Sequence, residues 1–325
     1  MMAYFLRRLL YALPIVLGVN LLTFVLFFVV NTPDDMARMQ LGERRVTAQA
    51  IELWKAERGY DRPLFWDASR TGVNQLTDTL FFDSSRRLFS FDFGRSDAGR
   101  DIGADLRQRM WPSLAIAVPV LLVGLALALT WALLMAWLRG SALDTWSALV
   151  CVAMMSCSGL FYIIGGQWLM AKLWHLAPIS GYGDGLAALH FLVLPVLVGV
   201  LTSLGASVRW YRALFAEELA KDYVRMAHAK GLSEPRVMLG HVLRNTLIPI
   251  LTGVVVLLPS LFLGALITEA FFAIPGLGSY TIEALQAQDF AIVRAMVYLG
   301  SLLYIAGLLL TDLSYVLVDP RVRLA

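Results

Sequence analysis

The sequence predicts an all-α membrane protein, a polytopic helical bundle with six transmembrane helices. Two observations on composition lead there: 58% of the 325 residues are hydrophobic, and the mean hydropathy is +0.68. Soluble domains contain only roughly 45–50% apolar residues. The third observation is that the apolar residues lie in long runs without charges. Since about 20 such residues cross a hydrocarbon core as a helix, a soluble globular domain is excluded.

The sequence contains six long uncharged runs, and most of them have at least the roughly 20 residues that a membrane-spanning helix needs. We expect each run to form one span. The runs are 9–30, 110–138, 145–171, 185–208, 245–268 and 295–311. The first run is longer than the apolar part of a secretory signal peptide, and no small-x-small cleavage site follows it before Asp34. We therefore expect it to remain as the first span. The last run is the shortest.

Basic residues in the short loops predict the orientation, because cytoplasmic loops carry an excess of Lys and Arg whereas long loops contribute little. With the N-terminus inside, the short external loops hold only Lys172 and Arg294. The cytoplasmic side then collects Arg7, Arg8, Arg139, Arg209, Arg212, Lys221, Arg225, Lys230, Arg236, Arg244, Arg321 and Arg323. We expect both termini to be cytoplasmic.

Three regions follow from this topology. Residues 1–30 form the cytoplasmic N-terminus and first span, residues 31–110 an extended external loop, and residues 111–325 a core with five spans. Within the external loop, 47–58 has the pattern of a helix, with Thr47 as N-cap and Gly59 as its stop. Residues 101–109 have apolar residues at helical spacing, and we expect them to lie along the interface before the second span.

The charged segment, residues 209–245, interrupts the apolar C-terminal half. Asp222 to Ala229 is predicted to be helical, supported by Glu217 with Lys221 and Asp222 with Arg225 at helical spacing. Gly231 stands where a glycine ends a helix, and Ser233 is a suitable N-cap for the next one. Two short polar helices joined by a hinge suggest a docking handle rather than a pocket.

Residues for catalysis or cofactor binding are missing from the sequence. It contains no phosphate-binding G-x-x-x-x-G-K-[ST] loop. The four histidines are scattered, without Cys or carboxylate at ligand spacing, so no metal site is predicted. No basic and aromatic module for nucleic acid is present either. An intramembrane hydrolase is disfavoured for the same reason, since the spans offer no nucleophile with a base.

Several motifs resemble one family, in its order along nearly the whole chain. They are Leu6–Leu10 with Pro14, Asp61–Leu64, Asp92–Ser96, Pro178–Gly181, Ala229–Leu232, His241–Pro249, Ala273–Gly278 and Asp319–Arg323. This pattern is similar to the bacterial ABC importer permease subunits of the dipeptide/oligopeptide/nickel branch. Two departures stand out. Arg225, Met226 and Ala227 occupy the place of Glu-Ala-Ala in the broader superfamily. Gly159 stands where relatives commonly have proline, so the sequence does not itself predict the bend that the resemblance implies in the third span.

The resemblance implies a type I ABC importer permease fold in the bacterial inner membrane, in contact with membrane lipids. Such a subunit is not an enzyme. It forms half of a path for peptides or related small solutes, beside a second homologous permease subunit. Two cytoplasmic ATPase subunits bind ATP and Mg, so this chain needs no cofactor. An external binding protein delivers the solute, and segment 31–110 is either its contact surface or a lid over span ends.

The resemblance also assigns residues within the charged segment. Those expected to couple to the ATPase are Tyr223, Arg225, Ala227, Ala229, Lys230, Gly231 and Leu232, supported by His241, Arg244 and Asn245. Tyr223, Ala227 and Gly231 share one helix face, which we expect to meet the ATPase; the alternative is packing on this chain's own span ends. No residue is assigned to solute binding, and peptides, nickel complexes, glutathione and oligosaccharides all remain open as solutes.

Two further points stay open at this stage. An ion-coupled secondary transporter is the alternative class, and it would need carboxylates near mid-span and an inverted repeat. Neither is evident in the sequence. Glu269, at the outer end of the fifth span, is either solvated or part of the turn formed by residues 271–278, which would bound the translocation path.

Overall fold

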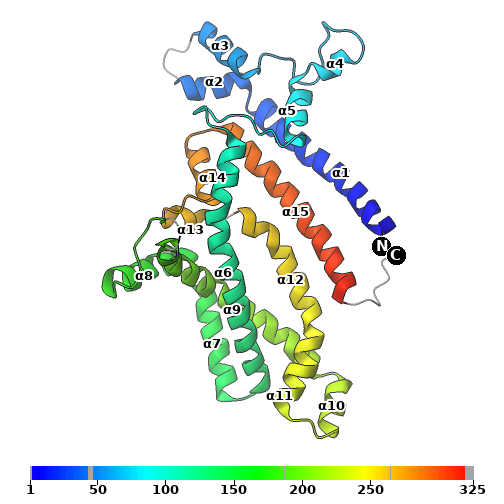
Figure 1. Ribbon diagram of the computed structural model, residues 1–325, viewed down its shortest axis with the longest axis vertical. Helices are drawn as coiled ribbons and strands as arrows, with labels where there is room; N and C mark the ends of the chain where they lie inside the picture. The colour runs from blue at the N-terminus through cyan, green and yellow to red at the C-terminus, as the bar shows by residue number, and fades with distance from the viewer. Residues whose placement is uncertain (1, 43–46, 184, 186, 264, 319–325) are drawn as a thin grey trace. The chain divides into compact units, whose positions relative to one another are not determined.

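The computed structural model describes residues 2–42, 47–183, 185, 187–263 and 265–318, and these residues are helical apart from turns and one isolated bridge between Arg95 and Asp101 (Figure 1). The all-α class predicted from the sequence is confirmed. Residues 319–325, which include Arg321 and Arg323 of the orientation argument, lie outside the described residues.

The helices follow one another along the chain in this order: α1 Met2–Phe24, the π-helical η1 Val25–Val30, α2 Pro33–Leu41, α3 Ala48–Arg58, α4 Asn74–Thr77, α5 Leu80–Phe89, α6 Ile102–Trp137, α7 Ala142–Ser156, α8 Gly159–Gly166, the π-helical η2 Gln167–Leu173, α9 Ala187–Leu219, α10 Asp222–Ala229, α11 Glu234–Val237, the π-helical η3 Met238–Val242, α12 Leu243–Leu263, α13 Leu266–Phe271, α14 Leu277–Gln286 and α15 Phe290–Val318.

Five helical stretches among the described residues are long and apolar enough to cross a membrane, or six when a bent pair is included as one span. The pair is α7 with α8 and η2, which meet at an angle of 91°. The bend that the resemblance implies in the third span, which the sequence itself left open, is therefore present. Cys157 and Ser158 both adopt extended backbone, with ψ of 131° and 144°, and this interrupts the helix without a proline.

A correction concerns residues 101–109. Residues 102–109 begin α6 and continue into the second span, instead of forming a separate interfacial helix. Ile102 and Leu106 are buried, which explains their helical spacing.

The described residues divide into two units, which we treat separately. The N-terminal unit consists of residues up to 109 together with 280–306, and the core unit consists of 110–279 with the residues from 307 onward. Residues 280–306 thus group with segment 31–110, whereas the sequence placed them with the core.

An aromatic cluster fills the N-terminal unit. Phe24 and Phe28 have ring centroids 4.8 Å apart, and Tyr60 meets Phe28 edge-on at 5.2 Å. Ile51 and Trp54 of α3 are buried in the same cluster. The predicted ends of α3 are confirmed: the Thr47 side chain accepts from the Ala50 N–H, and Gly59 has a φ of 70°. Local capping signals therefore determine where this helix begins and ends.

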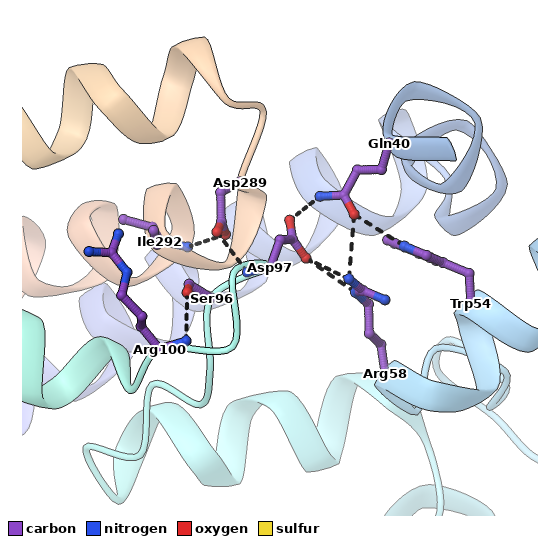
Figure 2. A network of polar contacts seen from close by, with 8 residues as sticks. All are labelled: Gln40, Trp54, Arg58, Ser96, Asp97, Arg100, Asp289 and Ile292. Atoms are coloured by element: carbon purple, nitrogen blue, oxygen red, sulfur yellow. Dashed lines mark hydrogen bonds and ion pairs between the residues drawn. The ribbon is translucent and has the colours of Figure 1, made fainter. Parts of the chain in front are cut away.

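A polar network joins α2, α3, the loop before α6 and the start of α15 (Figure 2). The Asp97 carboxylate accepts hydrogen bonds from Gln40 and, at 3.1–3.2 Å, from Arg58. The backbone N–H of Asp97 donates to Asp289 at 2.7 Å. Burial raises the pKa of Asp289, and the N–H groups of Asp97, Ile292 and Ala291 oppose that shift. Asp97 thus joins elements that lie far apart in the sequence.

Replacing Asp97 with alanine is expected to loosen this unit by about 1 kcal/mol, because Arg58 and Gln40 lose an acceptor in a partly exposed network. The backbone bond to Asp289 should persist. Thermal unfolding and protease cleavage of the loop 92–101 measure the effect. Asp78→Ala is the control, since its ion pair with Arg70 is 47% and 59% exposed at the two side chains. Equal effects of the two substitutions would contradict the role given to Asp97.

The core unit packs its helices around small residues. α7 and α9 approach so closely at Gly205 that a Cβ there would lie 2.7 Å from the Cys151 carbonyl oxygen. Around this contact lies a buried cluster from α6, α7, α9, α10, η3 and α12, including Ala132, Val208 and Phe215. Helix α10 is therefore packed into the same core as the spans.

Candidate functional site: the charged segment and the cavity

The charged segment begins as a continuation of a span. Helix α9 runs on to Leu219, so residues 209–219 are helical and are not part of a loop. Val208, Tyr211, Phe215 and Glu218 are buried at spacings of three and four residues, which is the period of one helix face. This buried face keeps α9 helical beyond its apolar run.

The junction between α9 and α10 is held by Glu218, whose residue is only 8% exposed. Its carboxylate accepts from the Tyr223 hydroxyl and from Lys221 Nζ, each at 2.6 Å. The expected pair of Glu217 with Lys221 is thus replaced by Glu218 with Lys221. Burial raises the pKa of Tyr223 to about 12, so its hydroxyl keeps the proton that it donates.

The hinge after α10 has the geometry predicted for it. Gly231 has a φ of 77°, and the N–H groups of Gly231 and Leu232 donate to the carbonyls of His228 and Ala227 at 2.9 and 3.3 Å. This pattern is the Schellman motif that ends many helices. Ser233 occupies the N-cap of α11 as expected, although its side chain makes no capping bond. His228 and Glu234 lie 3.0 Å apart across the hinge.

The face of α10 that the sequence assigned to the ATPase packs against this chain, and the opposite face is exposed. Val224 and Ala227 are 1% and 4% exposed, and Tyr223 and Leu232 pack against the same core cluster. The face of Tyr223 and Ala227 therefore packs on this chain's own helices, so these two cannot be the contact surface expected from the sequence. Tyr223, Ala227 and Leu232 instead hold α10 in place.

The opposite face of α10 is open. The Asp222 and Arg225 side chains, 3.4 Å apart, are 94% and 77% exposed, and Met226 is 56% exposed. Ala229, Lys230 and Gly231 are exposed at the end of the helix. We call Asp222, Arg225, Met226, Ala229 and Lys230 the outer face. Of the predicted support residues, Arg244 and Asn245 are exposed and His241 is half-buried.

Replacing Gly231 with alanine is expected to loosen the hinge by about 1 kcal/mol, because an L-residue resists a φ of 77°. A Cβ there meets nothing within 4 Å, so the strain comes from the backbone alone. Trypsin should cleave faster between Arg225 and Arg236, while the amount of protein in the membrane stays normal. Gly240→Ala is the control, since its Cβ also meets open space without a positive φ. Unchanged cleavage in Gly231→Ala would contradict the strain argument.

An apolar cavity of about 350 Å³ lies between α6, α9, α12 and the start of α13. Gly199 allows α6 and α9 to meet beside it, because a Cβ there would lie 2.8 Å from Val120. The polar groups of its wall are Ser203, Ser207, Tyr211 and Thr268. None of the described residues in the wall is charged. The sequence did not indicate this cavity, since no motif marks it.

Glu269 is fully buried, so the possibility that it is solvated is excluded. Its carboxylate accepts from Ser113 Oγ at 2.8 Å and from the N–H groups of Ala265 and Ser279 at 3.1 and 3.0 Å. Ser113 in turn accepts from the Leu277 N–H. Ala265 and Thr268 line the cavity, so this buried carboxylate fixes the turn that bounds the cavity at one end.

Among the described residues, no three or more His, Cys, Asp or Glu side chains are grouped as a metal site requires. What the geometry offers is a bundle of membrane helices with an uncharged cavity between them and a helix with a charged outer face at one end. These features define a membrane transport subunit.

Comparison with known proteins specifies the class further. A family model described as binding-protein-dependent transport system inner membrane component matches residues 128–324, and the model of its N-terminal region matches residues 1–74. The chain belongs to this family. It is therefore a multi-pass inner-membrane permease and not an enzyme, and no cofactor is expected in it.

Relatives match over their full length. The dipeptide transport system permease protein DppB of Escherichia coli K12 is 28% identical over 350 residues, covering 99% of both chains. A putative peptide transport system permease protein of Brucella abortus is 30% identical over 329 residues, again with 99% of both covered. The di/tripeptide transport system permease protein DppB of Pseudomonas aeruginosa is 29% identical over 350 residues.

Proposed function

We propose that this chain is one of two homologous permease subunits of an ATP-driven importer of short peptides. It forms half of the translocation path, and its charged segment faces the cytoplasm, as do both termini. Two ATPase subunits, which bind ATP and Mg, dock on the cytoplasmic side, and an external binding protein delivers the peptide. The peptide class comes from the names of the relatives. Membrane lipids surround the spans, and nucleic acid has no part.

The observation that carries the docking proposal is the two-sided character of α10. Its inner face is bonded to α9 through Tyr223 and Glu218 and is packed into the core cluster. On its outer face, the Arg225 and Met226 side chains are exposed and are not part of the core cluster. A rigidly anchored short helix with an exposed methionine and charged neighbours suits a protein partner, because apolar anchors ringed by charges are typical of interfaces.

The ion-coupled secondary transporter is the alternative. The buried carboxylates of the core unit's described residues are Asp144, Glu218 and Glu269. Each of the three accepts hydrogen bonds from neighbouring side chains or backbone groups, and none of them lines the cavity. A proton- or ion-coupled path would need a carboxylate that the solute pathway reaches. This arrangement favours a transporter whose energy comes from ATP hydrolysis by another subunit, and not from ion coupling within this chain.

Met226→Glu tests the docking proposal in the complex expressed with all its subunits. We expect capture of the ATPase, and ATP hydrolysis stimulated by the binding protein, to fall about tenfold, because a charge replaces an apolar anchor. Ala220→Glu is the matched control, since it adds the same charge at an exposed position just before α10. Wild-type capture with Met226→Glu would contradict docking at the outer face. Direct binding assays on the external binding protein identify the solute.

A further inference from the structure

Asp144 and Arg212 form a two-pronged ion pair between α7 and α9. Arg212 Nε and Nη2 donate to the two carboxylate oxygens of Asp144 at 2.8 and 2.7 Å. The Asp144 residue is 6% exposed. The carboxylate also accepts from the Gly140 N–H at 3.1 Å, and the Asp144 N–H donates to Ser141. The aspartate is thus held in one orientation by the start of α7.

The pair links α9, which leads to the proposed docking helix α10, with α7, which leads to the bend before α8. On the α9 side, the helix continues from Arg212 to Glu218, which bonds Tyr223 of α10. On the α7 side, the helix runs to Ser156 and then breaks at the 91° bend into α8. Among the ion pairs of the described core unit, this one joins two long helices, and the others lie within the charged segment.

An ion pair with a buried carboxylate is a poor source of stability, because desolvation of that carboxylate offsets much of the attraction. Its best-supported role is to fix register. A guanidinium fork matches a carboxylate in one rotation and one translation, whereas apolar side chains at the same contact tolerate sliding. The contact at Gly205 brings α7 and α9 close together. Because glycine has no side chain, this contact provides no side-chain hydrogen bond that would fix one register of the two helices.

We propose that Asp144 and Arg212 are positioning residues that couple the docked α10 to the bend between α7 and α8. The pair keeps the end of α9 in register with α7, so that a displacement of α10 is carried to α8 instead of being lost as sliding between helices. This inference rests on the proposed docking at α10.

Arg212→Lys is the decisive variant, since it keeps the charge but loses the fork. Asp144→Leu combined with Arg212→Met replaces the pair by apolar packing. Arg209→Lys is the control, one turn earlier, where the arginine donates to Met155 Sδ at 3.8 Å instead of to a carboxylate. The variants are made in a chain lacking Cys151 and Cys157, with an environment-sensitive fluorophore on Phe161→Cys. Phe161 lies in α8 and is 77% exposed.

Three quantities are measured on the purified complex: ATPase capture, ATP hydrolysis stimulated by the binding protein with its co-purified solute, and the fluorescence change of α8 when ATP is added. For Arg212→Lys and for the apolar pair we expect normal capture, with the fluorescence change and the stimulation reduced about fivefold or more, within the usual range of coupling between sites. Arg209→Lys should give the same capture, stimulation and fluorescence change as the chain that keeps Arg209.

Normal fluorescence change and stimulation in Arg212→Lys would overturn the proposal. So would a loss of assembly in parallel with activity in every variant at the pair, since the two residues would then only hold the fold. Failure of the wild-type chain to capture any ATPase would instead refute the proposed function, and it is recognised in the same experiment before any variant is compared.

Discussion

Glu269→Ala is expected to abolish uptake and to reduce the folded permease severely. The substitution leaves Ser113 Oγ and the N–H groups of Ala265 and Ser279 without their buried acceptor. The bonds from Ser113 Oγ and the Ser279 N–H are buried, and each unsatisfied buried group costs about 1–3 kcal/mol. The sum is roughly 2 kcal/mol or more, a large share of the stability of a typical domain. The turn beside the cavity should lose its fixed geometry.

The measurement is the amount of detergent-extracted monodisperse protein together with its unfolding temperature. Glu269→Gln should fall between alanine and wild type, because one amide oxygen still accepts while its NH₂ group faces a backbone donor. Glu283→Ala is the control, since the Glu283 side chain is 56% exposed. Normal extraction and uptake with Glu269→Ala would refute the anchoring role.

Gly205→Ala has the second large expected effect. The new Cβ would meet the Cys151 carbonyl oxygen at 2.7 Å and Met154 Cβ at 3.0 Å, and a backbone oxygen cannot rotate away. Helices α7 and α9 must therefore separate, at about 3 kcal/mol or more, the upper range of overpacking. We expect a lower unfolding temperature and loss of uptake.

Gly165→Ala is the matched control, because it makes the same change within α8 where a Cβ meets nothing within 4 Å. It should behave as wild type, or slightly better, since alanine favours helix. If Gly205→Ala and Gly165→Ala unfold at the same temperature, the close approach of α7 and α9 at this point is wrong.

The parts of the fold that the sequence predicted depend on local chemistry. Thr47 and Gly59 bound α3 because their capping bonds involve neighbours within a few residues, and Gly231 ends α10 for the same reason. The apolar runs likewise located the spans. Each spanning segment must be long and apolar regardless of what it packs against, because it crosses the hydrocarbon core.

The misses depend on contacts between distant segments. The sequence assigned Tyr223 and Ala227 to a partner, although Val224, next to Tyr223, already suggested that this side is apolar and buried. The bend after Ser156 depends on two extended residues, Cys157 and Ser158, whose side chains give no clear signal. For each, the deciding information lies in tertiary packing.

Glu269 was left undecided for a similar reason. A carboxylate beside an apolar run looks solvated until its donors are known. Gly276 and Gly278 offered a clue, because glycines mark places where a backbone is approached closely. In the structure a Cβ at Gly276 would clash with the Glu269 carboxylate, and one at Gly278 would lie 2.9 Å from it.

The central claim is that the outer face of α10 meets an ATPase in the cytoplasm. Its most direct test is site-specific cross-linking of the active complex with Met226→Cys, in a chain lacking Cys151 and Cys157. Val224→Cys is the control on the same helix, since Val224 is 1% exposed. We expect Met226→Cys to cross-link to the ATPase subunit, to resist an impermeant thiol reagent in intact cells, and to react once the membrane is opened. Val224→Cys should give no cross-link. Labelling of Met226→Cys from outside intact cells, or an active complex that never cross-links there, would contradict the account.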